Sequence, residues 1–388
     1  MAQSEAYITG IGQSEVAIRT ARSPLLLTLD AVRMALDDAG LSIEQIDGVM
    51  TFPGKLSSNP GFSPLGADDV MDALGIRSRW HMGGLEQPAQ LSAIGVAAMA
   101  VKAGICRHVI CFRTVYEAAA PTRPEDFPRL SSGYADGPMQ WLLPYGALSA
   151  ACWTAQYAMQ HVVRYGMTRE QLGQIAINAS RNALRNPRAK AFTKEELTLG
   201  KYMRSKTISS PLCIYDCDRF SDGSTVLIVS AQDALDEVSS RPIRIAAMSG
   251  SISRPTYDQD EWTAPYYAGP ALWARCDYKP DQVDTAQLYD GFSFFVITWL
   301  EGLGFCERGE GHRFIEGGNR IAFDGELPLN THGGQLGAGR LHGFGFAHEA
   351  VSQLRGAAGD RQLPNAPRLA VAASGGGNMA AALLLAND

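Results

Sequence analysis

The sequence predicts an α/β fold made of two similar halves, and two observations support this. A helical pattern that ends at a glycine and leads into a short apolar strand occurs near both ends of the chain, a rhythm typical of parallel α/β sheets. In addition, DDAGLSIEQIDGVM at residues 37–50 and RCDYKPDQVDTAQLYD at residues 275–290 share one order of features: a helix end, a phrase with Gln and Asp, and a strand. A single internal repeat of this kind predicts a duplication rather than a solenoid.

The elements of the first half can be placed in order. Residues 6–11 are the first expected strand, and the helical pattern that follows has Ser23 at its N-cap and Gly40 at its C-terminal end. A second strand is expected to follow the phrase SIEQIDGVMTF. Residues 91–103, LSAIGVAAMAVKA, predict an apolar helix that ends at Gly104 and leads into the buried strand HVICFRTV.

The second half repeats the last of these pairs, because HEAVSQLRGAAGDRQLPNAPRLAVAASGGG resembles VAAMAVKAGICRHVICFRTV. Between the halves, residues 121–211 break the rhythm with several prolines, helical material such as REQLGQIAINASRNALRN and a charged stretch. An insertion of this size normally covers an active site or an interface. We therefore expect an N-terminal half from residues 1–120 and 212–235, an inserted loop region at 121–211, and a C-terminal half at 236–388.

The composition excludes several classes of protein. The 388 residues are 46% apolar and 19% charged, so the chain is not intrinsically disordered. No run of 18 or more apolar residues predicts a membrane span, and the net charge of −6 argues against a nucleic-acid-binding surface. The first twenty residues lack the features of a secretory signal, and the seven cysteines are too few for a disulfide scaffold. These features predict a cytoplasmic protein, and the low charge suggests surface buried against another subunit.

Several phrases together resemble the thiolase superfamily. They are PLCIYDCDRFSDGSTVLIVS at residues 211–230, LYDGFSFFVITWLEGLGFC at 288–306, NTHGGQLGAGRLHGFGFAHEAVSQLRG at 330–356 and SGGGNMAAALLL at 374–385. The resemblance covers essentially the whole chain and is strongest to the lipid-transfer-protein-type branch, which includes bacterial steroid side-chain aldolases. It implies a duplicated five-layered α-β-α-β-α fold with an inserted loop region, a homodimer, and acyl-CoA substrates.

The chain departs from the thiolases at all three of their reactive positions. By the spacing of the family, the nucleophilic cysteine falls near Gln87, where no cysteine is present. Ala373 and Ser374 stand before the terminal glycines in place of the second cysteine, and Arg340 takes the place of the histidine in the Gly-His-Pro motif. An acyl-enzyme needs a thiolate nucleophile and a base, so ordinary thiolysis or Claisen condensation is not expected.

Tyr289 and Asp290 are the first candidate catalytic residues. They occupy the place where thiolases carry an asparagine–glutamate pair, and a tyrosine here is thought to work in acid–base steps in similar aldolases. A phenol has an unperturbed pKa of about 10, so its environment must assist any proton transfer near neutrality. In an extended segment the side chain of Asp290 faces away from that of Tyr289.

His332 and His342 are candidate donors to an enolate oxygen. They lie in a glycine-rich stretch, HGGQLGAGRLHG, whose glycines, including Gly333, allow the backbone to approach a ligand closely. A histidine N–H and a backbone N–H suit the oxygen that becomes negative when a thioester enolate forms. The alternative is that a histidine caps a helix, and His348 on the following helix is expected to be structural.

Arg340 stays protonated and cannot act as a general base. It suits either an anionic or enolate oxygen in the substrate or an ion pair with Asp290. Gly376 in the terminal glycine run resembles a backbone oxyanion donor of the superfamily, and Gln87 and Gly333 complete the expected substrate-binding residues.

Other patterns point to no further cofactor. Glu86 is a weaker acid–base candidate, and Cys213 and Cys217 lack the spacing of a zinc site and are expected to be structural. No Gly-rich nucleotide motif is present, so we expect no metal and no cofactor apart from the CoA of the substrate.

The favoured function is an aldolase that cleaves a β-hydroxyacyl-CoA, such as a steroid side-chain thioester, to a ketone and a short acyl-CoA. Tyr289 would act as the base, and His332 or His342 would hold the enolate. The alternatives are an acyltransferase with unconventional residues and a non-catalytic acyl-CoA-binding or lipid-binding protein. The resemblance also implies a partner with an OB fold and a zinc ribbon, linked to a MaoC-type hydratase.

Overall fold

The computed structural model describes residues 4–84, 86–120, 139–253 and 263–388. The first half contains these elements: β1 (Ala6–Gln13), α1 (Pro24–Ala39), β2 (Gly48–Thr51), α2 (Ala67–Leu74), β3 (Trp80–Gly83), α3 (Ser92–Lys102), β4 (His108–Tyr116) and, after the insertion, β7 (Asp222–Ala231). The expected first strand, the two expected helices and the strand HVICFRTV are confirmed. The second strand, β2, lies within the phrase SIEQIDGVMTF and not after it. Ser23 caps α1 by accepting a hydrogen bond from the backbone N–H of Leu26 at 3.3 Å, and Gly40 ends the helix with a φ of 71°.

The remaining elements form the insertion and the second half. The insertion contributes α4 (Met139–Leu142), α5 (Ala150–Tyr165), α6 (Arg169–Leu184), α7 (Leu199–Met203) and β5 (Thr207–Ser209), followed by β6 (Leu212–Cys213). The second half has β8 (Ile243–Ile252), α8 (Pro265–Trp273), β9 (Thr285–Gln287), α9 (Ser293–Gly302), α10 (Gly311–Phe314), α11 (Gly334–Ala338), α12 (Phe344–Arg355), β10 (Leu369–Gly376) and β11 (Met379–Ala386).

Nine strands form one hydrogen-bonded array in the order β3-β2-β4-β7-β1-β8-β11-β10-β9. The order β2-β4-β7-β1 on one side corresponds to β9-β10-β11-β8 on the other, with the same parallel and antiparallel neighbours. The two sides meet where Tyr7 and Ile8 of β1 pair with Arg244 and Ile243 of β8. The repeated order of strands indicates a duplicated unit, while the exact limits of the two halves stay a prediction.

The expectation of a parallel sheet is wrong in part, because the array is mixed. β2 runs parallel to β3 and β4, and β9 runs parallel to β10, but β7 and β11 are antiparallel to their neighbours. The helix–strand rhythm describes only the parallel crossovers. β11 instead returns directly from β10 through a tight turn at Gly377, and β7 returns after the insertion.

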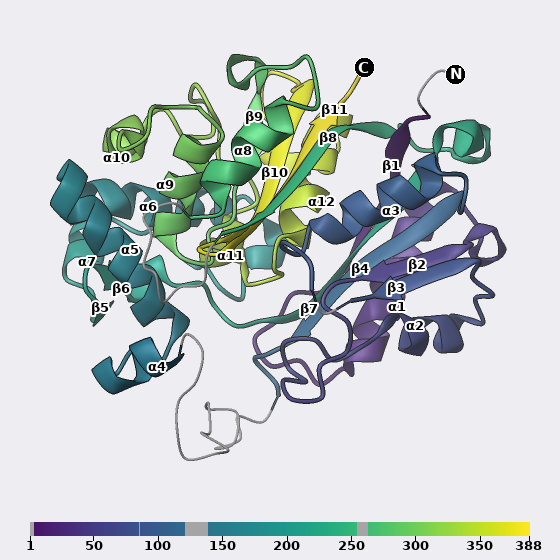
Figure 1. The fold of residues 1–388 in the computed structure, drawn as a ribbon, viewed down its shortest axis with the longest axis horizontal. Helices are drawn as coiled ribbons and strands as arrows, with labels where there is room; N and C mark the ends of the chain where they lie inside the picture. The colour runs from purple at the N-terminus through teal and green to yellow at the C-terminus, as the bar shows by residue number, and fades with distance from the viewer. Residues whose placement is uncertain (1–3, 85, 121–138, 254–262) are drawn as a thin grey trace.

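The layers follow from the side chains of the strands. In β4, Val109 and Cys111 join a central core, whereas Ile110 and Phe112 face α1 and α2. β11 alternates in the same way between the central core and the side of α8 and α9. The helices α3 and α12 contact strands of both halves, so they form the middle layer of a five-layered α-β-α-β-α arrangement (Figure 1). The predicted fold class is confirmed.

The repeated phrases have equivalent structural roles. Gln45 and Gln282 each accept a hydrogen bond from the backbone N–H three residues earlier, at 2.9 Å in both cases. Asp47 accepts backbone N–H groups at the start of β4, and Asp284 does so at the start of β10. The weak sequence repeat therefore corresponds to two turns that anchor the parallel strands.

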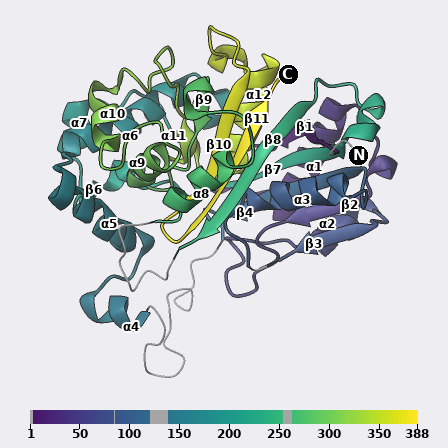
Figure 2. The ribbon, with the colours of Figure 1, turned by 45° about the horizontal axis from the view of Figure 1, so that its top comes forward.

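The insertion packs against the second half. Its helix α6 contacts α9, α10 and α11, and the teal helices of the insertion lie beside the green α9 and α10 in both views (Figures 1 and 2). Asn178 and Asn182 of α6 donate to the carbonyl oxygen of Leu329 at 3.2 and 2.8 Å. α6 thereby supports the loop that carries His332. The apolar α9 is largely buried within the chain, as expected for a core helix.

In the part of the chain that the structure describes, no helix combines the length and the apolar composition that a membrane span requires.

Replacing Gly12 in β1 by alanine should destabilise the fold. A Cβ there would lie 2.0 Å from the carbonyl oxygen of Ala31 in α1, and neither backbone segment yields easily. We expect Gly12→Ala to lower the free energy of unfolding by about 1–3 kcal/mol, the usual cost of overpacking. Chemical denaturation of the purified protein measures this.

The matched control is Gly200→Ala in the exposed turn of α7, where the new methyl group meets only the flexible end of Arg204. Helix propensity predicts a small gain, about 0.5–1 kcal/mol, for that change. Equal unfolding free energies for the two variants would contradict the close packing of β1 on α1.

Candidate active site

Tyr289 lies just after β9, where the chain turns toward α9. A Cβ at position 291 would lie 2.6 Å from the Tyr289 ring and 2.9 Å from its hydroxyl, so the phenol folds back over Gly291. The ring also lies near Phe295 and Phe346, with centroid separations of 6.2 and 6.3 Å. These neighbours are apolar, and the glycine makes room for the phenol.

Arg340 is held by two carboxylates. Its Nε and Nη2 donate to the two oxygens of Glu117 at 2.9 and 2.7 Å, and its Nη1 donates to Oδ1 of Asp218 at 3.2 Å. The guanidinium also lies over the Phe220 ring, 4.3 Å from its centroid. Burial disfavours the charge, but Asp218 and Glu117 outweigh it and raise the pKa of Arg340. The arginine is therefore a fixed positive charge beside the tyrosine.

The expected alternative that Arg340 pairs with Asp290 is wrong. Asp290 instead accepts the backbone N–H groups of Gln335 at 2.8 Å and Leu336 at 3.5 Å, at the start of α11. A carboxylate at a helix N-terminus satisfies amides that have no partner within the helix. Burial nevertheless raises the pKa of Asp290 to about 7. Its observed contacts indicate a structural role in positioning the glycine-rich loop.

The negative charge of Asp218 acts on Tyr289. Burial, followed by the negative charge of Asp218, raises the pKa of Tyr289, while Arg340 and a contact with Gln335 lower it. The phenol is therefore protonated at neutral pH. Burial also raises the pKa of Asp218 to about 7, although Arg340 opposes that shift.

His342 has partners on both ring nitrogens. Arg113 donates through Nη2 to His342 Nδ1 at 2.8 Å, so the remaining proton is on Nε2, which faces Oε2 of Glu117 at 3.5 Å. Burial and the two arginines hold the pKa of His342 well below its usual range. The backbone of His342 has a φ of 48°, and its N–H donates to Oε1 of Gln335 at 2.8 Å. The ring belongs to a charged cluster with Arg113, Arg340, Glu117 and Asp218. Because both of its nitrogens have partners there, it is not free to bind an enolate in this arrangement.

His332 keeps a nitrogen without a partner among the described residues. Its Nδ1 is buried, as is Nε2 of Gln335, which also lacks one. Both residues line a small cavity together with Gln13, Arg188 and Phe346. Burial lowers the pKa of His332 to about 4, so the ring is a neutral imidazole with one N–H to donate. Of the two predicted enolate-binding histidines, His332 is the one with an available nitrogen.

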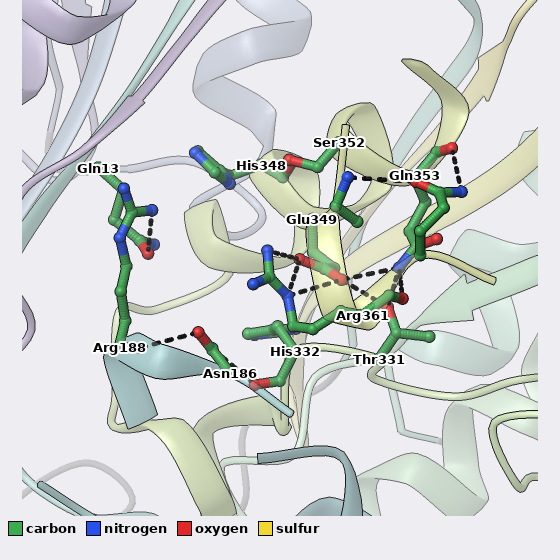
Figure 3. A network of polar contacts seen from close by, with 12 residues as sticks. Gln13, Asn186, Arg188, Thr331, His332, His348, Glu349, Ser352, Gln353 and Arg361 are labelled. Atoms are coloured by element: carbon green, nitrogen blue, oxygen red, sulfur yellow. Dashed lines mark hydrogen bonds and ion pairs between the residues drawn. The ribbon is translucent and has the colours of Figure 1, made fainter. Parts of the chain in front are cut away.

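A buried ion pair supports the loop that carries His332 (Figure 3). Thr331 donates to Oε1 of Glu349 at 2.8 Å, and Arg361 donates from Nε to Oε2 of Glu349 at 3.1 Å. Asn186 holds the other side of the loop by donating to the carbonyl oxygen of His332 at 2.9 Å. The predicted structural role of His348 is consistent with its burial in α12 beside this network.

The two positions at which the resemblance places the thiolase cysteines are adjacent in space. The loop before α3 meets the end of β10, where Ser374 Oγ accepts the backbone N–H of Leu91 at 3.0 Å. Gln87 in this loop accepts a hydrogen bond from Ser92 at 2.8 Å, and Gly376 lies against the Phe295 ring. Gly333 packs on α6 with a φ of 105°. The substrate-binding roles of Gln87, Gly333 and Gly376 stay predictions, and Glu86 is exposed.

A groove adjoins the charged cluster, and Asp218 forms part of its wall. Its apolar lining includes Ile18, Phe192, Ile214 and Phe220, and its basic lining includes Lys194, Lys201 and Arg219. Phe220 both lines the groove and covers Arg340, which joins the two features.

The cysteines near this site are poor nucleophiles. Cys217 lines the same groove, but burial raises the pKa of its thiol to about 12, and its Sγ lies 3.6 Å from the carbonyl oxygen of Cys213. All seven cysteines are free thiols. The described residues contain no group of three or more His, Cys, Asp or Glu side chains arranged to hold a metal ion.

Sequence reasoning missed Glu117, Asp218, Arg113 and Gln335. Glu117 directly follows β4, and polar residues at the carboxyl ends of sheet strands commonly form sites in α/β proteins. Asp218 lies within DCDRFSDG and Gln335 within HGGQLGAGR, two phrases that carry the family resemblance. The positions of these three residues could have indicated a site. No feature of the sequence indicated a role for Arg113, the arginine in the middle of the apolar strand HVICFRTV.

Comparison with known proteins agrees with the fold and the resemblance. Residues 256–386 match the thiolase C-terminal domain-like family. The chain is 34% identical over 369 residues to a steroid side-chain-cleaving aldolase from Thermomonospora curvata, covering 90% of each chain. It is 32% identical over 367 residues to a 17-hydroxy-3-oxo-4-pregnene-20-carboxyl-CoA lyase from Mycobacterium tuberculosis, covering 92% of this chain and 93% of the lyase.

Two solved structures are similar to that of this chain. An Ltp2–ChsH2(DUF35) aldolase superposes with a TM-score of 0.86 at 30% identity, covering 99% of this chain and 98% of that one. Human mitochondrial 3-ketoacyl-CoA thiolase shares the fold with a TM-score of 0.72 at 15% identity, covering 100% of this chain and 99% of the thiolase. The chain therefore belongs to the thiolase superfamily, in the group that contains the steroid side-chain-cleaving aldolases.

Proposed function

We propose that this protein is a carbon–carbon lyase that cleaves a β-hydroxyacyl-CoA by a retro-aldol reaction. The observation that carries the proposal is the cluster of Tyr289, Arg340, Glu117 and Asp218 in a thiolase fold. By the family resemblance, this chain has no cysteine at either position where thiolases carry one. Such a site has no nucleophile for an acyl-enzyme. It does have Tyr289, a group that can transfer a proton, next to the fixed positive charge of Arg340.

The reaction requires two things of the protein. The β-hydroxyl must lose its proton as the Cα–Cβ bond breaks, and the thioester enolate that results must be stabilised until Cα is protonated. We propose that Tyr289 exchanges this proton and that Arg340 offsets the negative charge without titrating. The neutral His332, with backbone donors, is our candidate for holding the enolate oxygen. The thioester itself accepts the electron pair.

The groove is compatible with a steroid thioester. Its apolar residues suit a ring system, and its lysines and arginine suit the phosphates of CoA. The Mycobacterium tuberculosis relative is named as a lyase of a 17-hydroxy-steroid carboxyl-CoA, and we propose a substrate of that class here, cleaved to a 17-ketosteroid and propionyl-CoA.

We also propose that the protein works in the cytoplasm as a homodimer together with a DUF35-type partner. The support for the partner is the superposed aldolase, whose name joins ChsH2(DUF35) to Ltp2. A link to a MaoC-type hydratase rests only on the family resemblance.

Replacing Tyr289 by phenylalanine tests the proposed function. The ring still packs over Gly291, but the proton-exchanging hydroxyl is lost, so we expect turnover to fall by roughly 10²–10⁴-fold, the usual contribution of a general acid–base group. Binding of the CoA ester and the melting temperature should change little. The assay follows ketone and short acyl-CoA release from a 17-hydroxy-steroid carboxyl-CoA.

Tyr145→Phe is the matched control, because that tyrosine is 85% exposed and loses the same hydroxyl. It should turn over like wild type. Undiminished cleavage by Tyr289→Phe would contradict the role of the tyrosine. Detection of a covalent acyl-protein by intact mass would favour an acyltransferase, and binding of CoA esters without conversion would favour a non-catalytic binding protein.

Co-expression with a DUF35-type protein tests the partner. If the two chains form a complex, they should co-purify in a fixed ratio, and the complex should be more soluble or more active than this chain alone. Size-exclusion chromatography with light scattering measures both the complex and the homodimer. Separate elution of the two proteins, with full activity of this chain by itself, would contradict the partnership.

A further inference from the structure

A neutral tyrosine can take a proton from a substrate only if its own proton leaves at the same time. Burial raises the pKa of Tyr289, so the phenol cannot act as a stored phenolate base near pH 7. The proposed retro-aldol reaction therefore needs a second group behind the tyrosine to accept that proton. That group must be a neighbour of Tyr289 with an atom free to accept the phenol proton.

Three carboxylates, Glu117, Asp290 and Asp218, are near Tyr289 and Arg340. In two of them, both oxygens accept hydrogen bonds. Both oxygens of Glu117 accept hydrogen bonds from Arg340. Both oxygens of Asp290 accept backbone N–H groups at the start of α11. Each oxygen of these two carboxylates already has a donor, so neither residue offers an oxygen without a hydrogen-bond partner.

Asp218 is different. Its Oδ1 is anchored by Arg340, while its Oδ2 is buried and has no hydrogen-bond partner among the described residues. The side chain is only 6% exposed, so bulk water does not satisfy that oxygen. A buried carboxylate oxygen without a partner is costly, and that cost falls when the oxygen receives a proton.

We propose that Asp218 is the proton acceptor behind Tyr289. This inference rests on the proposed function and deepens it. In the cleavage step, the β-hydroxyl O–H breaks and its proton moves to the Tyr289 oxygen, while the phenol's own proton moves to Oδ2 of Asp218. The electron pair left on the β-oxygen forms the ketone as the Cα–Cβ bond breaks, and the bond pair becomes the enolate.

The same pathway run in reverse completes the cycle. Tyr289 gives its proton to Cα of the enolate, and Asp218 returns its proton to Tyr289. Both residues end as they began, so no external acid, base or oxidant is consumed. The negative charge moves from Asp218 to the enolate and back, always near Arg340, which limits the electrostatic cost of the transfer. Substrate binding must bring the phenol and Oδ2 together, as catalytic hydrogen bonds often tighten only in the complex.

The pH dependence follows from the groups that face Asp218. These are Arg340, Glu117, Tyr289, Asp290 and the thiol of Cys217. Burial raises the pKa of Asp218 to about 7, and the relay needs the carboxylate form. Turnover should therefore be full above about pH 7 and fall roughly tenfold per pH unit below it.

Asp218→Asn tests the relay. Asparagine keeps an oxygen for Arg340 but cannot accept a proton, so we expect kcat to fall by roughly 10²-fold or more with KM changed less than about threefold. Any residual turnover should lose the acidic limb of the pH profile. The comparison variant is Glu117→Gln, which also removes one carboxylate from Arg340 but should retain the acidic limb.

A structural role gives a different pattern. If Asp218 only positioned Arg340, Asp218→Asn would retain kcat within a few-fold and keep the wild-type acidic limb, which would overturn the proposal. If the variant does not fold, the wild-type enzyme supplies the test. Its exchange of the α-protons of propionyl-CoA in D₂O should follow the same acidic limb, and a rate independent of pH between 5 and 9 would overturn the proposal.

Two outcomes distinguish failure of the relay from failure of the lyase function. Wild-type cleavage with an unaffected Asp218→Asn variant rejects the relay and keeps the lyase. Absence of both cleavage and α-proton exchange in the wild type rejects the lyase, and the relay with it.

Discussion

The charge of Arg340 is the constraint on which the rest of the site depends. A guanidinium that is 18% exposed must be compensated, and removing a partner from such an ion pair costs about 3–5 kcal/mol. Glu117 and Asp218 supply the compensation, and Arg113 and His342 complete the cluster around Glu117. By the family resemblance, Arg340 stands where thiolases have a histidine. Because arginine cannot exchange a proton, the proton-transfer work falls to its neighbours.

The duplicated fold brings these neighbours together from distant parts of the chain. Glu117 follows β4, Asp218 precedes β7, Tyr289 follows β9, and Arg340 lies between α11 and α12. Gly291 gives the phenol its space, and Asp290 fixes the start of α11 that carries Gln335. The insertion adds α6 and Asn186, which support the loop of His332. Each half therefore contributes charged groups to one site, and neither half forms it alone.

Local patterns in the sequence were enough to predict the α/β class, the duplication, the main helices and the family. Ser23, Gly40, Gln45 and Gln282 act within a few residues of their own positions, so their roles can be read from sequence spacing. The partners of Arg340 could not be found in this way, since Glu117 and Asp218 lie 223 and 122 residues from it. The direction of β7 and β11 was missed because hydrophobic periodicity does not distinguish parallel from antiparallel neighbours. The contact of His342 with Arg113 could not be predicted either, because Arg113 lies in an apolar strand 229 residues away.

The most direct measurement is a single reaction in D₂O between the purified enzyme and a 17-hydroxy-steroid carboxyl-CoA, with both products and the intact protein analysed by mass spectrometry. A lyase that works through a protonated tyrosine and an enolate should release ketone and short acyl-CoA in equal amounts, with at least one deuterium added at Cα and no change in the protein mass. Release of acyl product only when free CoA is added, together with an acylated protein, would contradict a retro-aldol site and restore thiolase chemistry to this fold.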